Sequence, residues 1–313
     1  AVPPQKQGLP VVVLVVGSAW LGHRGAIYLG TSWWNSSGPR TVASVGSVCV
    51  CIRHRGAFPP PPPWYVFAAA SLILWWALPV VISLSLVWHL AAHGAATHAD
   101  MVDDVCTALK WVRANRATLV HAAPAPGPRF AFDPSRQPSC THPPLVFGGY
   151  SSGGHVAMTL LQSPAMLAKH GLPPPAELCD GVLLLSGVLG TRLSRTRTSL
   201  ASPLISDFIL STCWGTTAAR ALPSPVHQLE LSPALPHMLI GCEHEVFGLP
   251  WVEAAMADVL FCSRAVAAGL TERGGRASLI EVRSDHWFVL GSKALRDALV
   301  RTLCDQEWPS KAS

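Results

Sequence analysis

The fold of this chain is decided by one stretch, Phe147-Gly148-Gly149-Tyr150-Ser151-Ser152-Gly153-Gly154-His155. It places a G-x-S-x-G pattern between an apolar run, Pro144 to Phe147, and a segment with helical spacing. This is the sequence form of a nucleophile elbow, in which a serine sits on a strained strand-to-helix turn. Glycine two residues before and two residues after the serine leaves room for so tight a reversal. The stretch therefore predicts that Ser151 presents its hydroxyl at the tip of a sheet.

Two segments further along the chain can supply the partners that such a serine needs. A short apolar run, residues 236–241, is followed by a turn with two carboxylates, and we predict Glu245 as the triad acid with Glu243 as the alternative. A second strand-like run, residues 277–282, leads to His286, which we predict as the general base. A serine hydroxyl is a poor nucleophile at neutral pH, so a histidine must take its proton while a carboxylate fixes the tautomer and stabilises the imidazolium.

An oxyanion hole needs two backbone N–H groups close to the nucleophile. We expect one donor at Ser152, the residue after the nucleophile, and the other at Gly17 or Ser18, in the loop that follows the apolar run Val11 to Val16. A glycine at position 18, after Gly17, would let the backbone approach a substrate closely, and the side chain of Ser18 hinders this approach. We therefore expect a weakened oxyanion hole.

At this point the chain resembles the α/β-hydrolase superfamily, and within it the esterase branch that includes hormone-sensitive-lipase-like carboxylesterases and isoprenylcysteine methylesterases. The resemblance implies a serine carboxylic-ester hydrolase that works through an acyl-enzyme on an apolar ester, lipid-like or of prenylcysteine type. It covers most of residues 10 to 305, and its motifs are Val11 to Trp20, Asp103-Asp104-Val105 with Ala108 to Val112, Asp133 to Arg136, the elbow, Leu185-Ser186-Gly187, Ser232-Pro233 and the regions of Glu245 and His286.

The chain departs from this family in three places. It has Val16-Gly17-Ser18 where relatives carry His-Gly-Gly, His54-Arg55 where they usually show Tyr-Arg, and glutamate in place of the commoner aspartate as triad acid. The first departure favours an alternative, a non-catalytic ligand binder with the same fold and a degraded oxyanion loop. An amidase or formamidase is a further alternative, because the acyl-enzyme route serves amides as well.

A large apolar insertion interrupts the resemblance. Residues 56–99 contain no Asp, Glu, Lys or Arg, and the run Trp64 to Leu90 is long and apolar enough for a membrane span. A single crossing would split the domain, and Pro79 divides the run into two short arms, so we predict a hairpin that dips into one leaflet and contacts membrane lipid. A buried core helix and a gene-model artefact remain alternatives. The expected organisation is residues 1–55 and 100–313 as parts of one hydrolase domain, with 56–99 inserted.

The order of strand-like and helix-like segments predicts an α/β fold, with a mostly parallel sheet and helices on both faces. Expected strands are 11–16, 42–52, 145–147, 181–186, 238–240 and 278–282, and expected helices are 25–34, 101–116, 152–169, 252–268 and 292–304. The strands lack period-two alternation, which is typical of strands covered on both faces.

Composition limits the classes of partner and compartment. The formal charge of +5 is spread without a basic block, so we expect no nucleic-acid partner. The nine scattered cysteines make a poor disulfide framework and favour an intracellular protein with reduced thiols. Together with the apolar insertion, this leads us to expect a membrane-associated intracellular protein, with the endoplasmic reticulum as one candidate membrane. We expect no cofactor and no metal, because His244 between two glutamates lacks metal-ligand spacing.

Overall fold

A six-stranded sheet organises the part of the chain that the structure describes. The structure is a computed structural model, and it describes residues 10–18, 20, 31–56, 96–122, 144–191, 210, 222–245 and 260–304. The strand order is β2-β1-β3-β4-β5-β6, and every pairing is parallel. The strands are β1 (Val11–Val15), β2 (Val48–Ile52), β3 (Leu145–Tyr150), β4 (Gly181–Leu185), β5 (His237–His244) and β6 (Ala277–Asp285).

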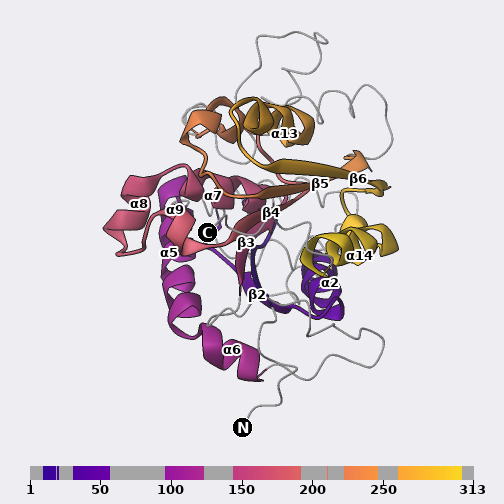
Figure 1. The fold of residues 1–313 in the computed structure, drawn as a ribbon, viewed down its shortest axis with the longest axis horizontal. Helices are drawn as coiled ribbons and strands as arrows, with labels where there is room; N and C mark the ends of the chain where they lie inside the picture. The colour runs from indigo at the N-terminus through magenta and orange to yellow at the C-terminus, as the bar shows by residue number, and fades with distance from the viewer. Residues whose placement is uncertain are drawn as a thin grey trace, which may run out of the picture.

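Helices cover both faces of this sheet (Figure 1). Alternate residues of β1 enter two separate cores: Val11, Val13 and Val15 pack on one face and Val12 and Leu14 on the other. The first core includes side chains of α5 (His98–Ala114), α7 (Ser152–Leu161) and α13 (Ser263–Glu272), and the second includes side chains of α2 (Thr31–Ser44) and α14 (Lys293–Leu299). Burial of both faces explains why the strands are apolar without alternation, and the predicted parallel α/β sheet is confirmed.

The remaining helical elements are short. They are α6 (Arg116–Ala122), α8 (Pro164–Lys169), α9 (Pro175–Leu178), η3 (Pro225–His227), η4 (Leu229–Leu231), η6 (Val289–Gly291) and η7 (Val300–Cys304). The predicted helix 152–169 is in fact two helices, because Pro164 cannot continue α7 and instead begins α8.

One segment of the sequence prediction is wrong. We expected a strand over 42–52, whereas α2 runs from Thr31 to Ser44 and the strand begins only at Val48. The expected helix at residues 25–34 lies outside the described residues except at 31–34, which belong to α2. Val42, in the last turn of α2, and Val45, just after its end, are three residues apart and both enter the second core, so their apolar character serves the end of a helix and not a strand. Gly46 follows with φ +88°, the left-handed conformation that commonly ends a helix.

The carboxyl ends of four neighbouring strands meet at one edge of the sheet. Ser151 follows β3, Ser186 follows β4, Glu245 follows β5 and His286 follows β6. In open parallel sheets this edge is where ligands bind. Four residues that are far apart in the sequence are therefore brought side by side.

The pairing of β5 with β6 contains an irregularity just before this edge. Cys242 pairs with Val282, but the next pair is His244 with Asp285, so β6 carries one more residue than β5 over this interval. An extra residue of this kind is a bulge, which re-aims the side chains that follow it. Both Glu245 and His286 lie directly after it.

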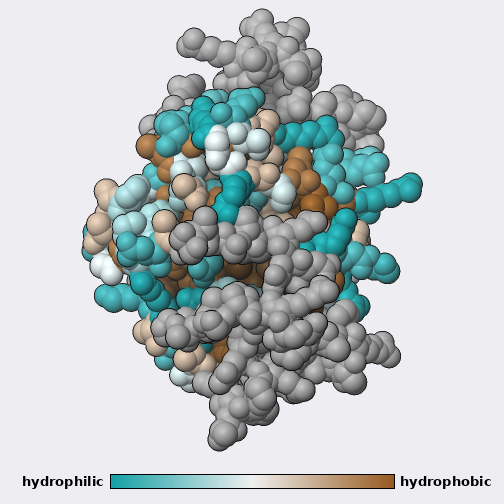
Figure 2. Space-filling model, in the orientation of Figure 1, coloured by the Kyte–Doolittle hydropathy of each residue, from teal (hydrophilic) through white to brown (hydrophobic). Residues whose placement is uncertain are grey.

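The predicted apolar insertion, residues 56–99, lies outside the described residues except at its two ends, and the Trp64–Leu90 segment lies wholly outside them. Among the helices that are described, none combines the length and the apolar character that a membrane crossing requires. Figure 2 shows hydrophilic side chains along much of the described surface in this view.

A glycine in β3 offers a test of how tightly this sheet is packed. A Cβ atom on Gly148 would lie 1.7 Å from the carbonyl oxygen of Leu183, whereas a Cβ on Gly241 in β5 would lie no closer than 3.7 Å to any neighbour. We expect Gly148→Ala to lower the free energy of unfolding by about 3 kcal/mol or more through overpacking, and Gly241→Ala to leave it nearly unchanged. Urea denaturation of both variants measures this, and equal stabilities would contradict the strand packing.

Candidate active site

Ser151 occupies a sharply bent backbone between β3 and α7. Its φ of 54° and ψ of −128° lie in a region that non-glycine residues rarely adopt. The surroundings hold it there: the Ser151 N–H donates to the Leu185 carbonyl at 3.1 Å, and the Ser151 carbonyl accepts from Gly154 N–H at 3.0 Å and Val188 N–H at 2.9 Å. The strain is thus compensated by three backbone hydrogen bonds.

The two glycines of the motif are required by close backbone approach. A Cβ on Gly149 would lie 2.4 Å from the backbone of Gly153, and one on Gly153 would lie 2.1 Å from the carbonyl oxygen of Val15. No other residue type fits either position. The predicted elbow geometry is present, and it seats the start of α7 directly on the end of β1.

The structure brings the three predicted triad residues into contact. His286 Nε2 lies 2.9 Å from Ser151 Oγ, and His286 Nδ1 lies 3.2 Å from Glu245 Oε2. His286 and Glu245 are 5% and 4% exposed, so their interaction is largely screened from water. This hydrogen-bonded order of serine, imidazole and carboxylate is the arrangement of a catalytic triad, in which the imidazole can take the serine proton.

The two candidate carboxylates are separated clearly by their surroundings. Glu245 Oε1 accepts a hydrogen bond from the Cys242 N–H at 3.1 Å, and Oε2 faces the imidazole. Glu243 is half exposed and lies 3.9 Å from the guanidinium of Arg283 at the surface. The structure therefore places Glu245 at the imidazole and Glu243 away from it.

Aromatic rings enclose His286. The ring of Tyr150 is stacked on the imidazole, with centroids 5.0 Å apart and planes at 25°, while Phe261 and Trp287 approach to 4.8 and 5.5 Å. The Tyr150 hydroxyl donates to the His286 carbonyl at 2.5 Å. Burial raises the pKa of Tyr150 well above its usual value, so this hydroxyl stays protonated and remains a donor.

The loop after β1 lies where an oxyanion hole is expected, but one donor is already engaged. The N–H groups of Ser18 and Trp20 both donate to Ser152 Oγ, at 3.0 and 3.1 Å. Ser18 N–H is therefore directed at a side chain of α7. Within the described part of the chain the Gly17 and Ser152 N–H groups have no hydrogen-bond partner, so these two of the three predicted donors are the ones left for a substrate oxygen.

A buried histidine supports the same loop. His155 Nδ1 accepts from Trp20 Nε1–H at 3.3 Å, and Nε2 lies 2.8 Å from the Pro223 carbonyl, to which it donates. Burial lowers the pKa of His155 to about 4, so the ring is neutral at physiological pH and holds this tautomer. The residue serves to position the tryptophan.

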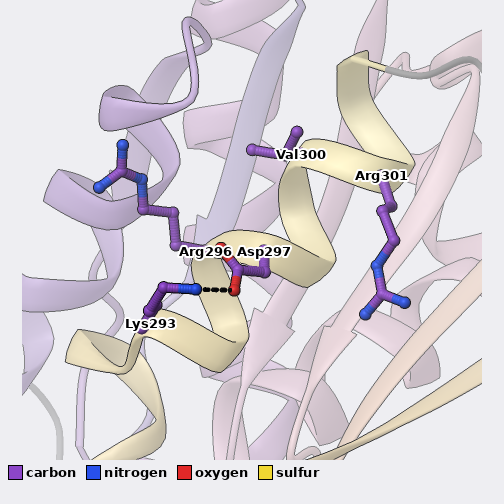
Figure 3. Close-up of a pocket in the computed structure, with 5 residues that line it drawn as sticks. All are labelled: Lys293, Arg296, Asp297, Val300 and Arg301. Atoms are coloured by element: carbon purple, nitrogen blue, oxygen red, sulfur yellow. Dashed lines mark hydrogen bonds and ion pairs between the residues drawn. The ribbon is translucent and has the colours of Figure 1, made fainter. Parts of the chain in front are cut away.

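No group of three or more His, Cys, Asp or Glu side chains suited to a metal ion occurs among the described residues. A hollow of about 440 Å³ lies on the outer side of α14 and η7, lined by Lys293, Arg296, Asp297, Val300 and Arg301. Figure 3 shows Lys293 paired with Asp297 there, at 2.6 Å, with Arg296 and Arg301 extending to either side of the helix. None of the triad residues lines this hollow.

Comparison with solved structures identifies the fold. The chain superposes on esterase B of Lactobacillus rhamnosis, in a structure with a tributyrin phosphonate inhibitor, with a TM-score of 0.52 and 14% sequence identity. The match covers 95% of this chain and 75% of that one. The chain also superposes on a Pyrobaculum calidifontis esterase with a TM-score of 0.51 and 16% identity, over 96% of this chain and 78% of that one. The chain has the α/β-hydrolase fold. No family model and no curated protein matches the sequence.

Within this α/β-hydrolase fold, three site features have no counterpart in the sequence prediction. They are the Ser152 hydroxyl as acceptor for the loop, Tyr150 against the imidazole, and Ser186 between His286 and Glu245. Ser152 and Ser186 both stood in motifs that we had singled out, but with no side-chain role. Only the meeting of several strand ends reveals one.

Ser152 Oγ accepts two hydrogen bonds from the loop after β1, and this gives a prediction for the loop. Ser152→Ala leaves the buried N–H groups of Ser18 and Trp20 without their acceptor, so we expect the free energy of unfolding to fall by about 1–3 kcal/mol. We also expect slower labelling of Ser151 by a fluorophosphonate, since the loop loses its anchor. Ser47→Ala is the matched control, because that buried hydroxyl has no hydrogen-bond partner in the described part of the chain. If both variants behave like the native protein, the loop does not depend on Ser152.

Proposed function

We propose that this protein is a serine carboxylic-ester hydrolase that works through an acyl-enzyme. The observation that carries the proposal is the pair of contacts at His286, which faces Ser151 through Nε2 and Glu245 through Nδ1. Ester cleavage is supported by the names of the solved structures that share the fold, both of which are esterases. The geometry also provides a backbone N–H next to the nucleophile for the developing oxyanion.

The proposed reaction divides the chemistry among named atoms. Ser151 Oγ attacks the ester carbonyl carbon as its proton passes to His286 Nε2. The N–H groups of Ser152 and Gly17 stabilise the negative carbonyl oxygen of the tetrahedral intermediate. The imidazolium then gives its proton to the departing alcohol, which leaves an acyl group on Ser151. A water molecule that His286 deprotonates releases the acid and restores the serine.

Glu245 and the aromatic rings support the imidazolium that forms during this reaction. Glu245 is held by the Cys242 N–H, so its negative charge stays directed at Nδ1. The stacked face of Tyr150 adds a favourable cation–π contact once the ring is charged. Both effects are largest in the transition state, where positive charge develops on the ring, and therefore accelerate the chemical step.

The finer proposal is an apolar substrate that is lipid-like or of prenylcysteine type, taken from a membrane by an intracellular, membrane-associated enzyme. The apolar segment Trp64 to Leu90 and the family resemblance support it. Phe288, two residues beyond His286, is 58% exposed and gives the nearby surface an apolar side chain. An exposed apolar side chain near the proposed site suits an apolar ester.

The proposed activity is tested first by covalent labelling. We expect a fluorophosphonate to label the native protein and hydrolysis of p-nitrophenyl butyrate to accompany it, and we expect Ser151→Ala to lose both, because the hydroxyl is the only proposed nucleophile. A folded native protein that is not labelled would contradict the proposal and favour a ligand binder, which the engaged Ser18 N–H also favours. Comparing butyrate esters with butyramides of the same leaving group separates an esterase from an amidase.

The role of Glu245 is tested against its neighbour. We expect Glu245→Gln to reduce kcat at least about a hundredfold, because the amide no longer stabilises the imidazolium charge. Glu243 lies two residues before Glu245, with its carboxylate at the surface near Arg283. The variant Glu243→Gln should therefore retain native kcat. Steady-state kinetics on the same ester decides between them. The reverse pattern would identify Glu243 as the triad acid.

The membrane proposal is tested by removing residues 64–90. We expect the shortened protein to lose binding to liposomes and its preference for long-chain over short-chain esters, since the apolar segment is the proposed contact with lipid. Labelling of Ser151 by the fluorophosphonate serves as the control for a folded site. Liposome flotation and chain-length profiles that match the native protein, with labelling intact, would overturn this part of the proposal.

A further inference from the structure

Ser186 stands between the two triad residues that face each other. It follows β4 directly, is completely buried, and its Oγ lies 2.6 Å from His286 Nδ1. The same Oγ donates a hydrogen bond to Glu245 Oε2. The direct contact of His286 Nδ1 with Glu245 Oε2 is longer, at 3.2 Å. The imidazole therefore lies closer to this hydroxyl than to the carboxylate, and the hydroxyl contacts both groups.

The donors and acceptors at this point determine where the protons lie. His286 Nε2 faces Ser151 Oγ and accepts its proton in the reaction, so the neutral ring carries its own proton on Nδ1. A carboxylate can only accept, so the Ser186 hydroxyl proton is directed at Glu245 Oε2. Ser186 Oγ then has free lone pairs, one of which accepts from Nδ1–H. The result is a continuous chain of donors from His286 through Ser186 to Glu245.

The backbone of Ser186 adopts an unusual conformation that its neighbours hold in place. Its φ is 42°, in the left-handed region that is unfavourable for a serine, and its N–H donates to the Ile240 carbonyl of β5 at 2.7 Å. The carbonyl of the preceding residue, Leu185, accepts the N–H of Ser151. The end of β4 thus touches the nucleophile on one side and the strand that carries the acid on the other.

We propose that Ser186 is a positioning residue of the triad, whose hydroxyl joins His286 Nδ1 to Glu245 and fixes the orientation of both groups. This inference rests on the proposed function. No proton needs to reach the carboxylate: the ring accepts the Ser151 proton at Nε2 and keeps its own at Nδ1. Ser186 holds the ring in that tautomer and keeps one carboxylate lone pair occupied by a fixed donor. A hydrogen-bonded network of this kind rigidifies buried polar groups beyond what a pair achieves.

The first test removes the Ser186 hydroxyl in two different variants. Ser186→Ala removes only the hydroxyl, and Ser186→Gly removes it while suiting the positive φ, so at least one variant should fold normally. We expect kcat for p-nitrophenyl butyrate to fall about ten- to a hundredfold in both, the value of one hydrogen bond to a charged group, with KM within about twofold of native. Thr302→Val is the matched control, because it removes another buried hydroxyl, bonded to the Ala298 carbonyl, outside the triad.

The second test asks whether Ser186 acts through Glu245. In a Glu245→Gln background we expect Ser186→Ala to change kcat by less than about threefold, because residues that act as one unit are not additive. We also expect the downfield proton resonance of His286 Nδ1–H to shift in Ser186→Ala and to stay unchanged in Thr302→Val. These two readouts do not respond to a loss of packing alone.

Each outcome has one meaning. If the native protein neither hydrolyses the ester nor reacts with a fluorophosphonate, the proposed function fails, whatever Ser186 does. If the native protein is active and both Ser186 variants retain native kcat, the positioning role is wrong. If the loss in kcat is the same with and without Glu245, Ser186 acts independently of the carboxylate and the inference is overturned.

Discussion

The close approach of three backbone segments at Ser151 is the constraint on which the rest of the site depends. Gly153 touches the end of β1, Gly149 touches the first turn of α7, and the Ser151 N–H reaches the end of β4. These contacts require residues without a Cβ atom at positions 149 and 153. The strained serine backbone is a consequence of this packing, and it projects the hydroxyl toward His286.

Backbone strain is concentrated near the same point. Among the described residues, four that are not glycine have positive φ, and three of these are Trp20, Ser151 and Ser186. Each is held by hydrogen bonds to a different strand or helix, through Ser152, Leu185 and Ile240 respectively. Such conformations cost of order 1–3 kcal/mol each and persist only when the surroundings over-determine them. The two cores on either face of the sheet supply that rigidity.

The sequence predicts the elements of this site better than their mutual arrangement. The elbow is a local pattern whose glycines have one steric reason, so it could be predicted from nine residues. The positions of Glu245 and His286 after later strands followed from chain order. Ser186 and Tyr150 could not be assigned roles, because their partners are 100 and 136 residues away and depend on strand register.

The errors have a similar origin. Residues 42–52 are apolar enough for a strand, but only tertiary packing shows that Val42 enters the second core from the last turn of α2 and Val45 from the turn that follows it. The oxyanion donors were expected from backbone positions alone, and the sequence does not reveal that the Ser152 side chain would engage Ser18 N–H. The predicted insertion at residues 56–99, and with it membrane contact, stays a prediction.

The bulge between β5 and β6 makes the site sensitive to chain length as well as to residue type. Side chains along a strand alternate between its faces, so one residue more or less reverses the direction of all that follow. The extra residue of β6 lies between Val282 and Asp285, within four residues of His286. An in-frame loss of a single codon there would leave every site residue in the gene and the sheet largely paired, yet it would turn the imidazole away from Ser151. Such a loss would separate the proposed nucleophile from its proposed base in one step, and an alignment of the site residues would not reveal the change.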